Sequence, residues 1–201
     1  MATHTPRQRL TLPIIVDTAL AVLDDQGLEN LTTTNVARRL GVTQPALYSH
    51  IANLDELRRA VATHGARELS GLVRDAVAGR AGDDALHAMA HAYREYVRRH
   101  PDRYLLQLSA PRSPAYTRAM QRAAEAVRGV LRSYGLDENQ VREAHVAFRA
   151  AVHGFAHLEA RGALPARPAT ANDDFDAFIA LFAAGLRAIA PAPDNGGKGA
   201  A

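Results

Sequence analysis

The sequence predicts an all-α protein, made of a small N-terminal helical domain followed by a larger helical bundle. Apolar residues recur at helical rather than alternating spacing, and no segment is enriched in Val, Ile and Tyr as a β-strand would be. Gly and Pro interrupt the pattern at intervals suited to helices. We expect about nine helices, at residues 12–26, 33–40, 44–51, 54–79, 83–99, 102–108, 113–134, 137–161 and 172–190.

The second predicted helix ends in a tight turn. Val36, Ala37 and Leu40 fall on one helical face, whereas the two arginines that lie between them fall outside it. Gly41 follows directly, and glycine adopts the left-handed conformation that ends a helix at little cost. The chain therefore reverses here within about three residues.

The third predicted helix begins with a capping residue. The hydroxyl of Thr43 can cap it, and Pro45 falls in the first turn, where the missing backbone N–H costs nothing. Leu47 and Ile51 lie four residues apart and can close onto the core. The two helices and their turn form a helix–turn–helix, which places its second helix in the major groove of DNA.

The outward face of this helix is free of negative charge. No Asp or Glu occurs between Glu29 and Asp55, although acidic residues are common on both sides of that window. A surface that approaches DNA phosphates would be arranged in this way. The hydrogen-bonding and small residues that surround this face are Gln44, Pro45, Ala46, Tyr48, Ser49 and His50.

Composition agrees with a DNA-binding protein without requiring one. The 201 residues carry a formal net charge of +3, and the apolar content of 47% is enough to bury a core. The absence of cysteine excludes disulfides, thiol sensing and Cys-ligated zinc. The apolar stretches are far short of a membrane span and no leader opens the chain, so we expect a cytoplasmic protein with no membrane partner.

Four ordered motifs resemble the TetR family of one-component bacterial transcriptional repressors. They are Leu31-Thr-Thr, Val36-Ala-Arg-Arg-Leu-Gly-Val, Gln44-Pro-Ala-Leu-Tyr-Ser-His and Asn53-Leu-Asp-Glu-Leu, and the resemblance covers about residues 12–61. It implies a DNA-binding domain at residues 1–53 and an effector-binding and dimerisation domain at residues 54–190. The composition of residues 191–201 predicts a disordered tail.

The resemblance also implies roles for individual residues. Thr33 and Thr34 would contact phosphates and bases, Gln44, Pro45 and Ala46 would face base edges, and Tyr48 and His50 would bind the DNA backbone, with Ser49 on the same surface. Many members have lysine where this chain has Leu54, so one phosphate contact is in doubt. Arg7 and Arg9, in a Thr- and Pro-rich segment, suit either an arm that reaches a groove or a solvated tail.

The resemblance further implies a homodimer and a ligand. Two apolar stripes suit either an ordinary core or a four-helix interface between two copies, and a dimer would read a palindromic operator. One stripe is Val141, Phe148, Val152 and Phe155, and the other is Phe175, Phe178, Ile179, Phe182, Leu186 and Ile189. The segment Val152-His-Gly is similar to the Trp-His-Gly subgroup of TetR-like regulators, or is simply structural. A small organic effector is expected near the family's pocket, at Tyr93, Tyr104, Gln107, Met120, His145, Phe148, Arg149 and His153; a buried Arg149 would need an anion.

Two histidine pairs leave an alternative function open. His87 and His91, like His153 and His157, lie four residues apart, a spacing that can hold a metal ion from one helical face. No HExxH motif, nucleophile motif or phosphate loop accompanies them, so we expect hydrogen-bonded or solvated pairs, no metal site, no cofactor and no enzymatic activity. A helical metal-binding protein, carrier or enzyme remains the alternative to a regulator, as does a regulator without an effector.

Overall fold

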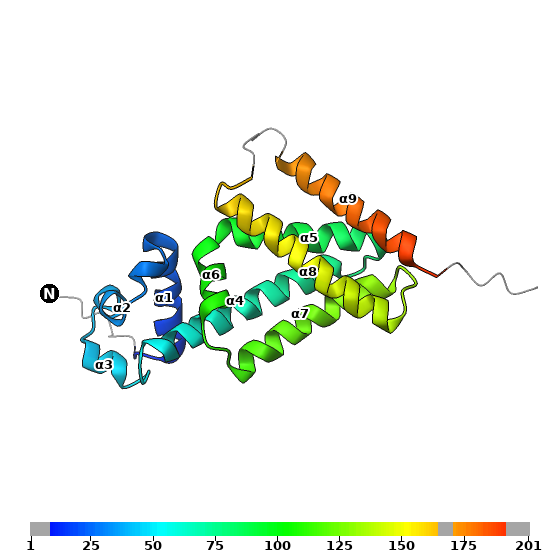
Figure 1. Cartoon of the computed structure of the whole chain (residues 1–201). Helices are drawn as coiled ribbons and strands as arrows, with labels where there is room; N and C mark the ends of the chain where they lie inside the picture. Colours follow the sequence, from blue (N-terminus) through cyan, green and yellow to red (C-terminus); the bar gives the residue numbers. More distant parts are fainter. Residues whose placement is uncertain (1–8, 165–170, 192–201) are drawn as a thin grey trace, which may run out of the picture. The chain divides into compact units, whose positions relative to one another are not determined.

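The computed structural model describes residues 9–164 and 171–191, which contain helices and no strands (Figure 1). Its α-helices in the described ranges are α1 (Leu12–Gln26), α2 (Thr33–Leu40), α3 (Gln44–Tyr48), α4 (Leu54–Val77), α5 (Gly82–Arg99), α6 (Pro101–Ser109), α7 (Pro114–Arg132), α8 (Glu138–Ala160) and α9 (Ala171–Ile189). The short 3₁₀-helix η1 (Leu28–Asn30) follows α1. The predicted all-α fold is confirmed. Arg7 and residues 192–201 of the predicted tail lie outside the described residues.

Helix α3 is shorter than predicted, ending at Tyr48 rather than at residue 51. The Ser49 hydroxyl donates to the Ala46 carbonyl at 2.7 Å, and the N–H groups of both His50 and Ile51 are directed at the carbonyl of Leu47. Sharing one carbonyl in this way tightens the last turn and ends the helix. The turn still delivers Ile51 to the core, where it is 2% exposed.

The described residues fall into two compact units. Unit 1 takes the chain up to Glu68 together with Arg99–Met120, and unit 2 takes Leu69–Arg98 and the chain from Gln121. Helices α4 and α7 contribute to both units, whereas α6 belongs to unit 1 and packs on α1. Unit 1 is therefore larger than the predicted DNA-binding domain, whose boundary after residue 53 stays a prediction about function.

The hydrophobic core of unit 1 includes the apolar residues of the helix–turn–helix. Leu31, Val36 and Leu47 are fully buried, and Leu106 of α6 joins the same cluster. Burying such side chains stabilises a fold by about 1.5–3 kcal/mol each. Because α2 and α3 place their apolar residues inward, their polar residues are left on the outer surface of the unit.

Unit 2 contains a buried ion pair that sequence reasoning did not predict. The Arg94 side chain of α5 is 3% exposed and binds both carboxylate oxygens of Glu159 in α8, at 2.7 and 2.5 Å. Arg94 also donates to Asn172 of α9 at 3.0 Å and lies over the ring of Phe175 at 4.6 Å. A buried guanidinium is tolerated because these partners compensate its charge, and their removal would be costly.

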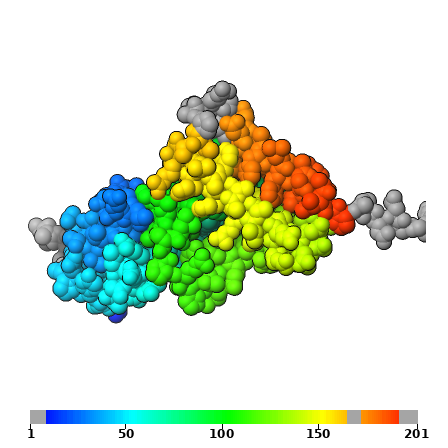
Figure 2. Space-filling view, in the orientation of Figure 1, coloured from blue at the N-terminus to red at the C-terminus, as the bar shows by residue number. Residues whose placement is uncertain are grey.

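Helices α8 and α9 lie side by side, in yellow and in orange to red in Figure 2. Both helices have exposed apolar side chains. Val146 is 63% exposed and Leu181 is 75% exposed. Leu158 and Ile189 are also exposed, whereas Phe175 and Leu186 are buried. The residues of the predicted stripes are therefore buried or half-buried within the single chain, except Ile189, and the exposed Val146, Leu158 and Leu181 lie outside those stripes.

No helix among the residues described by the structure is both long enough and apolar enough to cross a membrane.

Candidate nucleic-acid interface

The turn between α2 and α3 has the conformation predicted for Gly41. Its backbone is left-handed, with φ 66° and ψ 30°, and its N–H donates to the carbonyl of Arg38 at 3.1 Å. The Val42 N–H reaches back to the carbonyl of Ala37 at 3.0 Å. An added Cβ at Gly41 would meet no atom within 4 Å, so the backbone conformation and not crowding favours glycine here.

Both helices of the motif begin with a threonine cap. The Thr32 hydroxyl accepts the Asn35 N–H at 3.1 Å, and the Thr43 hydroxyl accepts the Ala46 N–H at 3.4 Å. The cap predicted at Thr43 is confirmed. Each cap satisfies a backbone N–H that the first turn of a helix leaves free.

The predicted contact residues of α2 and α3 meet in two pairs. The Gln44 side-chain amide donates to the Thr34 hydroxyl at 2.5 Å, and both residues border the outer surface. The hydroxyl oxygens of Tyr48 and Thr33 lie 3.3 Å apart. Tyr48 is 46% exposed, but Thr33 is only 9% exposed, so the geometry makes Thr33 a support for the Tyr48 hydroxyl.

The other predicted contact residues of α3 differ in exposure. Pro45, Ser49 and His50 are exposed, and Ala46 is half-buried. The Ser49 proton is engaged by the Ala46 carbonyl, so its hydroxyl presents acceptor lone pairs outward. With Gln44 and Tyr48, these residues form what we call the α3 face.

The two arginines of α2 are both exposed, but their surroundings differ. Arg39 forms an ion pair with Asp25 at 2.6 Å, so its charge is partly compensated within unit 1. Arg38 is exposed at the position before it. The side of α2 that carries the two arginines therefore has less uncompensated positive charge than their number suggests.

Half of a capping box is formed at the start of α4. The Asn53 side-chain carbonyl oxygen accepts the Glu56 N–H at 2.9 Å. The Glu56 carboxylate accepts the N–H of Ala52, at 2.5 Å, whereas a complete capping box would have it accept the N–H of Asn53. Glu56 thus serves the turn that leads from α3 into α4.

The predicted effector residues are distributed over both units. Tyr104, Gln107 and Met120 belong to unit 1, and Tyr93, His145, Phe148, Arg149 and His153 belong to unit 2. Those with buried side chains are Tyr104, Gln107 and Phe148, at 4–5% exposed. Arg149 is exposed in the chain, so the condition under which it would need a buried anion is not met.

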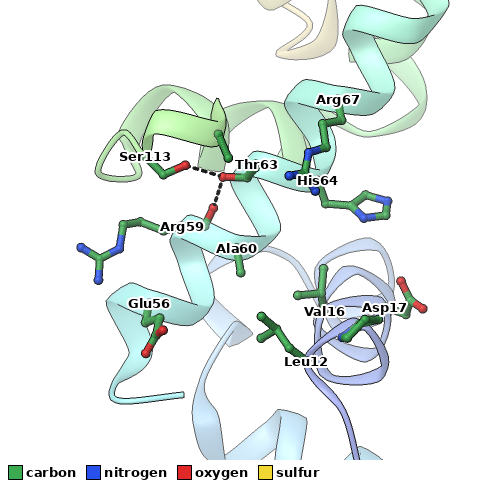
Figure 3. Close-up of a pocket in the computed structure, with 12 residues that line it drawn as sticks. Leu12, Val16, Asp17, Glu56, Arg59, Ala60, Thr63, His64, Arg67 and Ser113 are labelled. Carbon is green, nitrogen blue, oxygen red and sulfur yellow. Dashed lines mark hydrogen bonds between the residues drawn. The ribbon is translucent and has the colours of Figure 1, made fainter. Parts of the chain in front are cut away.

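Unit 1 contains a cavity of about 540 Å³ that the sequence did not predict (Figure 3). It lies between α1 and α4, beside the segment that begins α7, and none of the predicted effector residues lines it. Leu12, Val16 and Ala60 form its apolar part. Thr63 donates to the Arg59 carbonyl at 2.7 Å and lies 2.9 Å from the Ser113 hydroxyl. Its lining residues with ionisable side chains are Asp17, Glu56, Arg59, His64 and Arg67.

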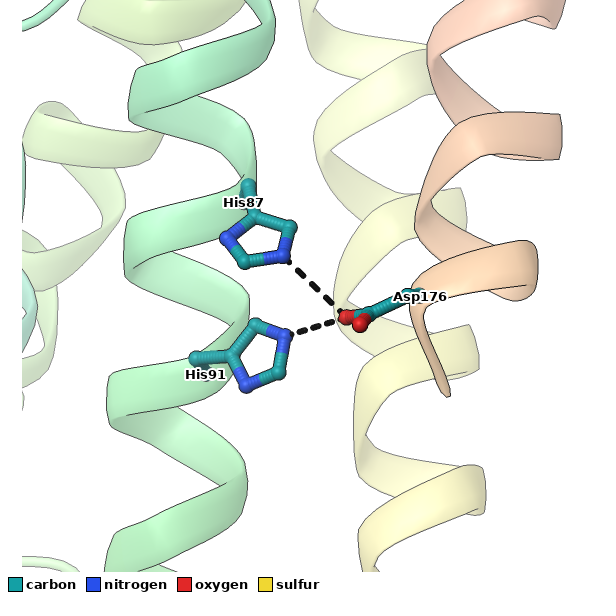
Figure 4. A group of neighbouring side chains, drawn as sticks. All are labelled: His87, His91 and Asp176. Carbon is teal, nitrogen blue, oxygen red and sulfur yellow. Dashed lines mark hydrogen bonds and ion pairs between the residues drawn. The ribbon is translucent and has the colours of Figure 1, made fainter. Parts of the chain in front are cut away.

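The two histidine pairs have different surroundings. The rings of His153 and His157 stack with their centroids 5.8 Å apart on α8. His87 and His91 of α5 both direct Nε2 at one carboxylate oxygen of Asp176 in α9 (Figure 4). Tertiary structure therefore adds an acidic partner to one pair that spacing alone did not indicate.

A helix–turn–helix with an exposed, acid-free recognition helix, set in an all-helical chain, defines a class of DNA-binding regulators. Residues 15–61 match the family model described as bacterial regulatory proteins of the tetR family, and residues 86–182 match the tetracyclin repressor-like C-terminal domain. An uncharacterized HTH-type transcriptional regulator of Mycobacterium tuberculosis, Rv0681, is 41% identical over 159 residues, or 78% of this chain and 73% of the relative. The chain belongs to the TetR family of transcriptional regulators.

Solved structures support the same fold. BioQ of Mycobacterium smegmatis is 29% identical with a TM-score of 0.65, covering 89% of this chain and 99% of that chain. A structure of BioQ with its double-stranded DNA operator is 28% identical with a TM-score of 0.65, covering 90% of this chain and 99% of that chain. The chain is similar to a protein seen on DNA over nearly its whole length.

Proposed function

We propose that this TetR-family regulator is a repressor that binds a palindromic DNA operator as a homodimer and is released by a small organic effector. The observation that carries the DNA-binding part is the α3 face, which is exposed and lies in a window without acidic residues. DNA repels carboxylates and accepts hydrogen bonds from exposed donors, so this surface suits a duplex. The similarity to BioQ, which has been seen with an operator, supports the same assignment.

The proposed contacts follow the positions of the side chains along α2 and α3. Gln44, Pro45 and Ala46 face base edges at the start of α3, where a recognition helix enters the groove. Tyr48, Ser49 and His50 contact the DNA backbone, and Thr34 adds a hydroxyl from α2. Thr33 acts mainly by holding the Tyr48 hydroxyl, since its own side chain is nearly covered.

The α8–α9 surface supports the proposed homodimer. Val146 and Leu181 are more than half exposed in the single chain, on two helices that lie side by side (Figure 2). Packing these helices against their copies would bury those side chains in a four-helix interface. Two copies would also present two α3 faces, and a symmetric pair reads a palindrome.

An organic effector is supported by two regions of the chain. One is the set predicted from the sequence, of which His145, Phe148 and His153 share α8. The other is the cavity between α1 and α4 (Figure 3), whose apolar wall and charged rim suit an organic molecule with polar groups. Crystals grown with compounds that lower operator affinity would decide between these regions.

Several narrower assignments belong to this proposal. A bacterial transcriptional regulator of this kind would act in the cytoplasm and would not need enzymatic activity. The similarity of Val152-His-Gly to the Trp-His-Gly subgroup stays a prediction. An added Cβ at Gly154 would meet no atom within 4 Å, so packing within one chain does not require glycine at this position.

Selection of bound duplexes from a random DNA pool tests the proposed function directly. We expect one palindromic sequence to be enriched, and the logarithm of its affinity to fall steeply as the logarithm of the salt concentration rises. A pool recovered without any sequence preference would refute the repressor assignment.

A further inference from the structure

Three potential metal ligands from two helices converge in unit 2. His87 and His91 come from successive turns of α5, and Asp176 comes from the first half of α9 (Figure 4). Nε2 of His87 lies 3.1 Å from Oδ1 of Asp176, and Nε2 of His91 lies 2.6 Å from the same oxygen. One atom from each residue lies within 4.8 Å of both others. The three side chains therefore surround one small space.

The residue types and spacing suit a divalent transition metal. Imidazole nitrogen and carboxylate oxygen are ligands of Zn²⁺ at about 2.0–2.2 Å, and ligands at those lengths in a tetrahedron lie about 3.3 Å apart. The His87–Asp176 separation is already close to this value, and the His91–Asp176 separation must widen by less than about 1 Å. Side chains on the surface make such adjustments easily, and His87 and Asp176 are about half exposed.

Asp176 lies within electrostatic reach of one arginine of α5, Arg94. Arg94, which lies on α5 one turn beyond His91, is paired bidentately with Glu159. One carboxylate and two imidazoles are ligand types that divalent transition metals accept.

We propose that His87, His91 and Asp176 bind one divalent transition-metal ion of the Zn²⁺, Co²⁺ or Ni²⁺ class, which links α5 to α9. Three protein ligands leave at least one coordination position for water or a ligand atom. His91 and Asp176 also line a cavity of about 410 Å³ with Arg94, Glu95, Arg98 and Asn172, which gives an additional ligand room beside the ion. The site stands independently of the proposed DNA-binding function.

Metal binding by the full chain without a histidine tag tests the site. Equilibrium dialysis or calorimetry with ZnCl₂ is expected to show one tight ion per chain, and CoCl₂ is expected to give the visible absorption of a low-coordinate Co²⁺ site. Because the ion joins two helices, Zn²⁺ should also raise the midpoint of thermal unfolding. The proposal would be overturned if the chain formed no 1:1 complex with any of these metal ions.

Three variants separate this site from adventitious binding to histidine. Asp176→Asn keeps the shape of the side chain, and His87→Gln removes one nitrogen ligand; each should weaken Zn²⁺ at least about 10-fold and abolish the thermal shift. The double variant His153→Gln/His157→Gln removes the pair that stacks on α8 and should bind like the unmodified chain. Equal Zn²⁺ affinity in Asp176→Asn and the unmodified chain would overturn the site, and so would equal loss in the double variant. Circular dichroism without metal verifies that each variant is folded.

Discussion

Gln44 and Tyr48 lie one turn apart on the α3 face but bind different partners in α2. The Gln44 amide reaches the exposed Thr34 hydroxyl, whereas the Tyr48 hydroxyl lies against the buried Thr33. A side-chain amide can pair with a base edge, and a phenol hydroxyl suits a phosphate. The two residues are therefore expected to contribute to different parts of DNA recognition.

Gln44→Ala should lower affinity for the selected operator by about 1–3 kcal/mol and relax its base preference. Tyr48→Phe should instead weaken binding to operator and unrelated DNA alike, because it removes a phosphate hydrogen bond but no base contact. Fluorescence anisotropy with both duplexes at fixed salt measures the two effects. An equal loss of sequence preference in both variants would show that these roles are wrongly assigned.

At the scale of helices, Gly41 and Gly71 form a matched pair. An added Cβ meets no atom within 4 Å at either position, but Gly41 has φ +66° while Gly71 lies in the interior of α4. Gly41→Ala should lower the free energy of unfolding by about 1–2 kcal/mol, since a left-handed conformation is strained for alanine. Gly71→Ala should raise it by about 0.5–1 kcal/mol, because alanine loses less entropy in a helix.

Urea unfolding of both variants measures this difference. If Gly41→Ala proved as stable as the unmodified protein, the turn would not depend on the left-handed conformation. If Gly71→Ala lowered the free energy of unfolding, the space around an added Cβ at this position of α4 would be smaller than in the structure of the single chain.

Helix α8 should make stability depend on pH. Burial lowers the pKa of His153, and the nearby charges of His157 and Arg149 lower it further. Burial also lowers the pKa of His145, together with Arg128 and Arg149. Below the ordinary histidine pKa of 6.5 the unfolded chain thus binds more protons than the folded chain, so stability is lost as the pH falls.

His153→Gln should remove part of this loss. The free energy of unfolding, measured by urea titration at several pH values from 7 to 5, should decline less steeply in the variant than in the unmodified protein. His64→Gln, at an exposed position of α4, is the matched control. A slope that is unchanged by His153→Gln would contradict this account of α8.

At the scale of the whole molecule, the proposed homodimer can be tested through the exposed apolar side chains of α8 and α9. Val146→Glu and Leu181→Glu change side chains that are exposed in the single chain, so each variant should stay folded. Each should become monomeric because the interface would bury an unpaired carboxylate, and operator affinity should fall with the loss of the second α3 face.

Analytical ultracentrifugation measures the association state of these variants. Leu72→Glu is the matched control, because Leu72 is also partly exposed, at 43%, but lies on α4. It is expected to remain dimeric. If Val146→Glu and Leu181→Glu sediment as the unmodified protein does, the interface does not include these residues.

The sequence by itself determined the helical class, the bounds of most helices and the local structure of the helix–turn–helix. These features depend on residues within one or two helical turns of each other, so they can be predicted without knowing which other helix packs against them. Examples are the apolar periodicity, the left-handed Gly41 and the Thr43 cap. The exposed α3 face follows from the same periodicity, because the apolar residues of α2 and α3 turn inward. Its contacts with DNA stay a prediction.

Only the tertiary structure decided which distant side chains meet. Arg94 pairs with Glu159, which lies 65 residues further along the chain, and His91 contacts Asp176, which lies 85 residues further. The cavity beside Thr63 likewise needs α1, α4 and the start of α7 in place. Periodicity indicates which face of a helix is apolar but not which other helix packs on that face. The sequence also does not indicate which distant group will hydrogen-bond with a given polar side chain. Those contacts arise from packing between helices, whose free energy depends on the complementarity of whole surfaces rather than on local residue order.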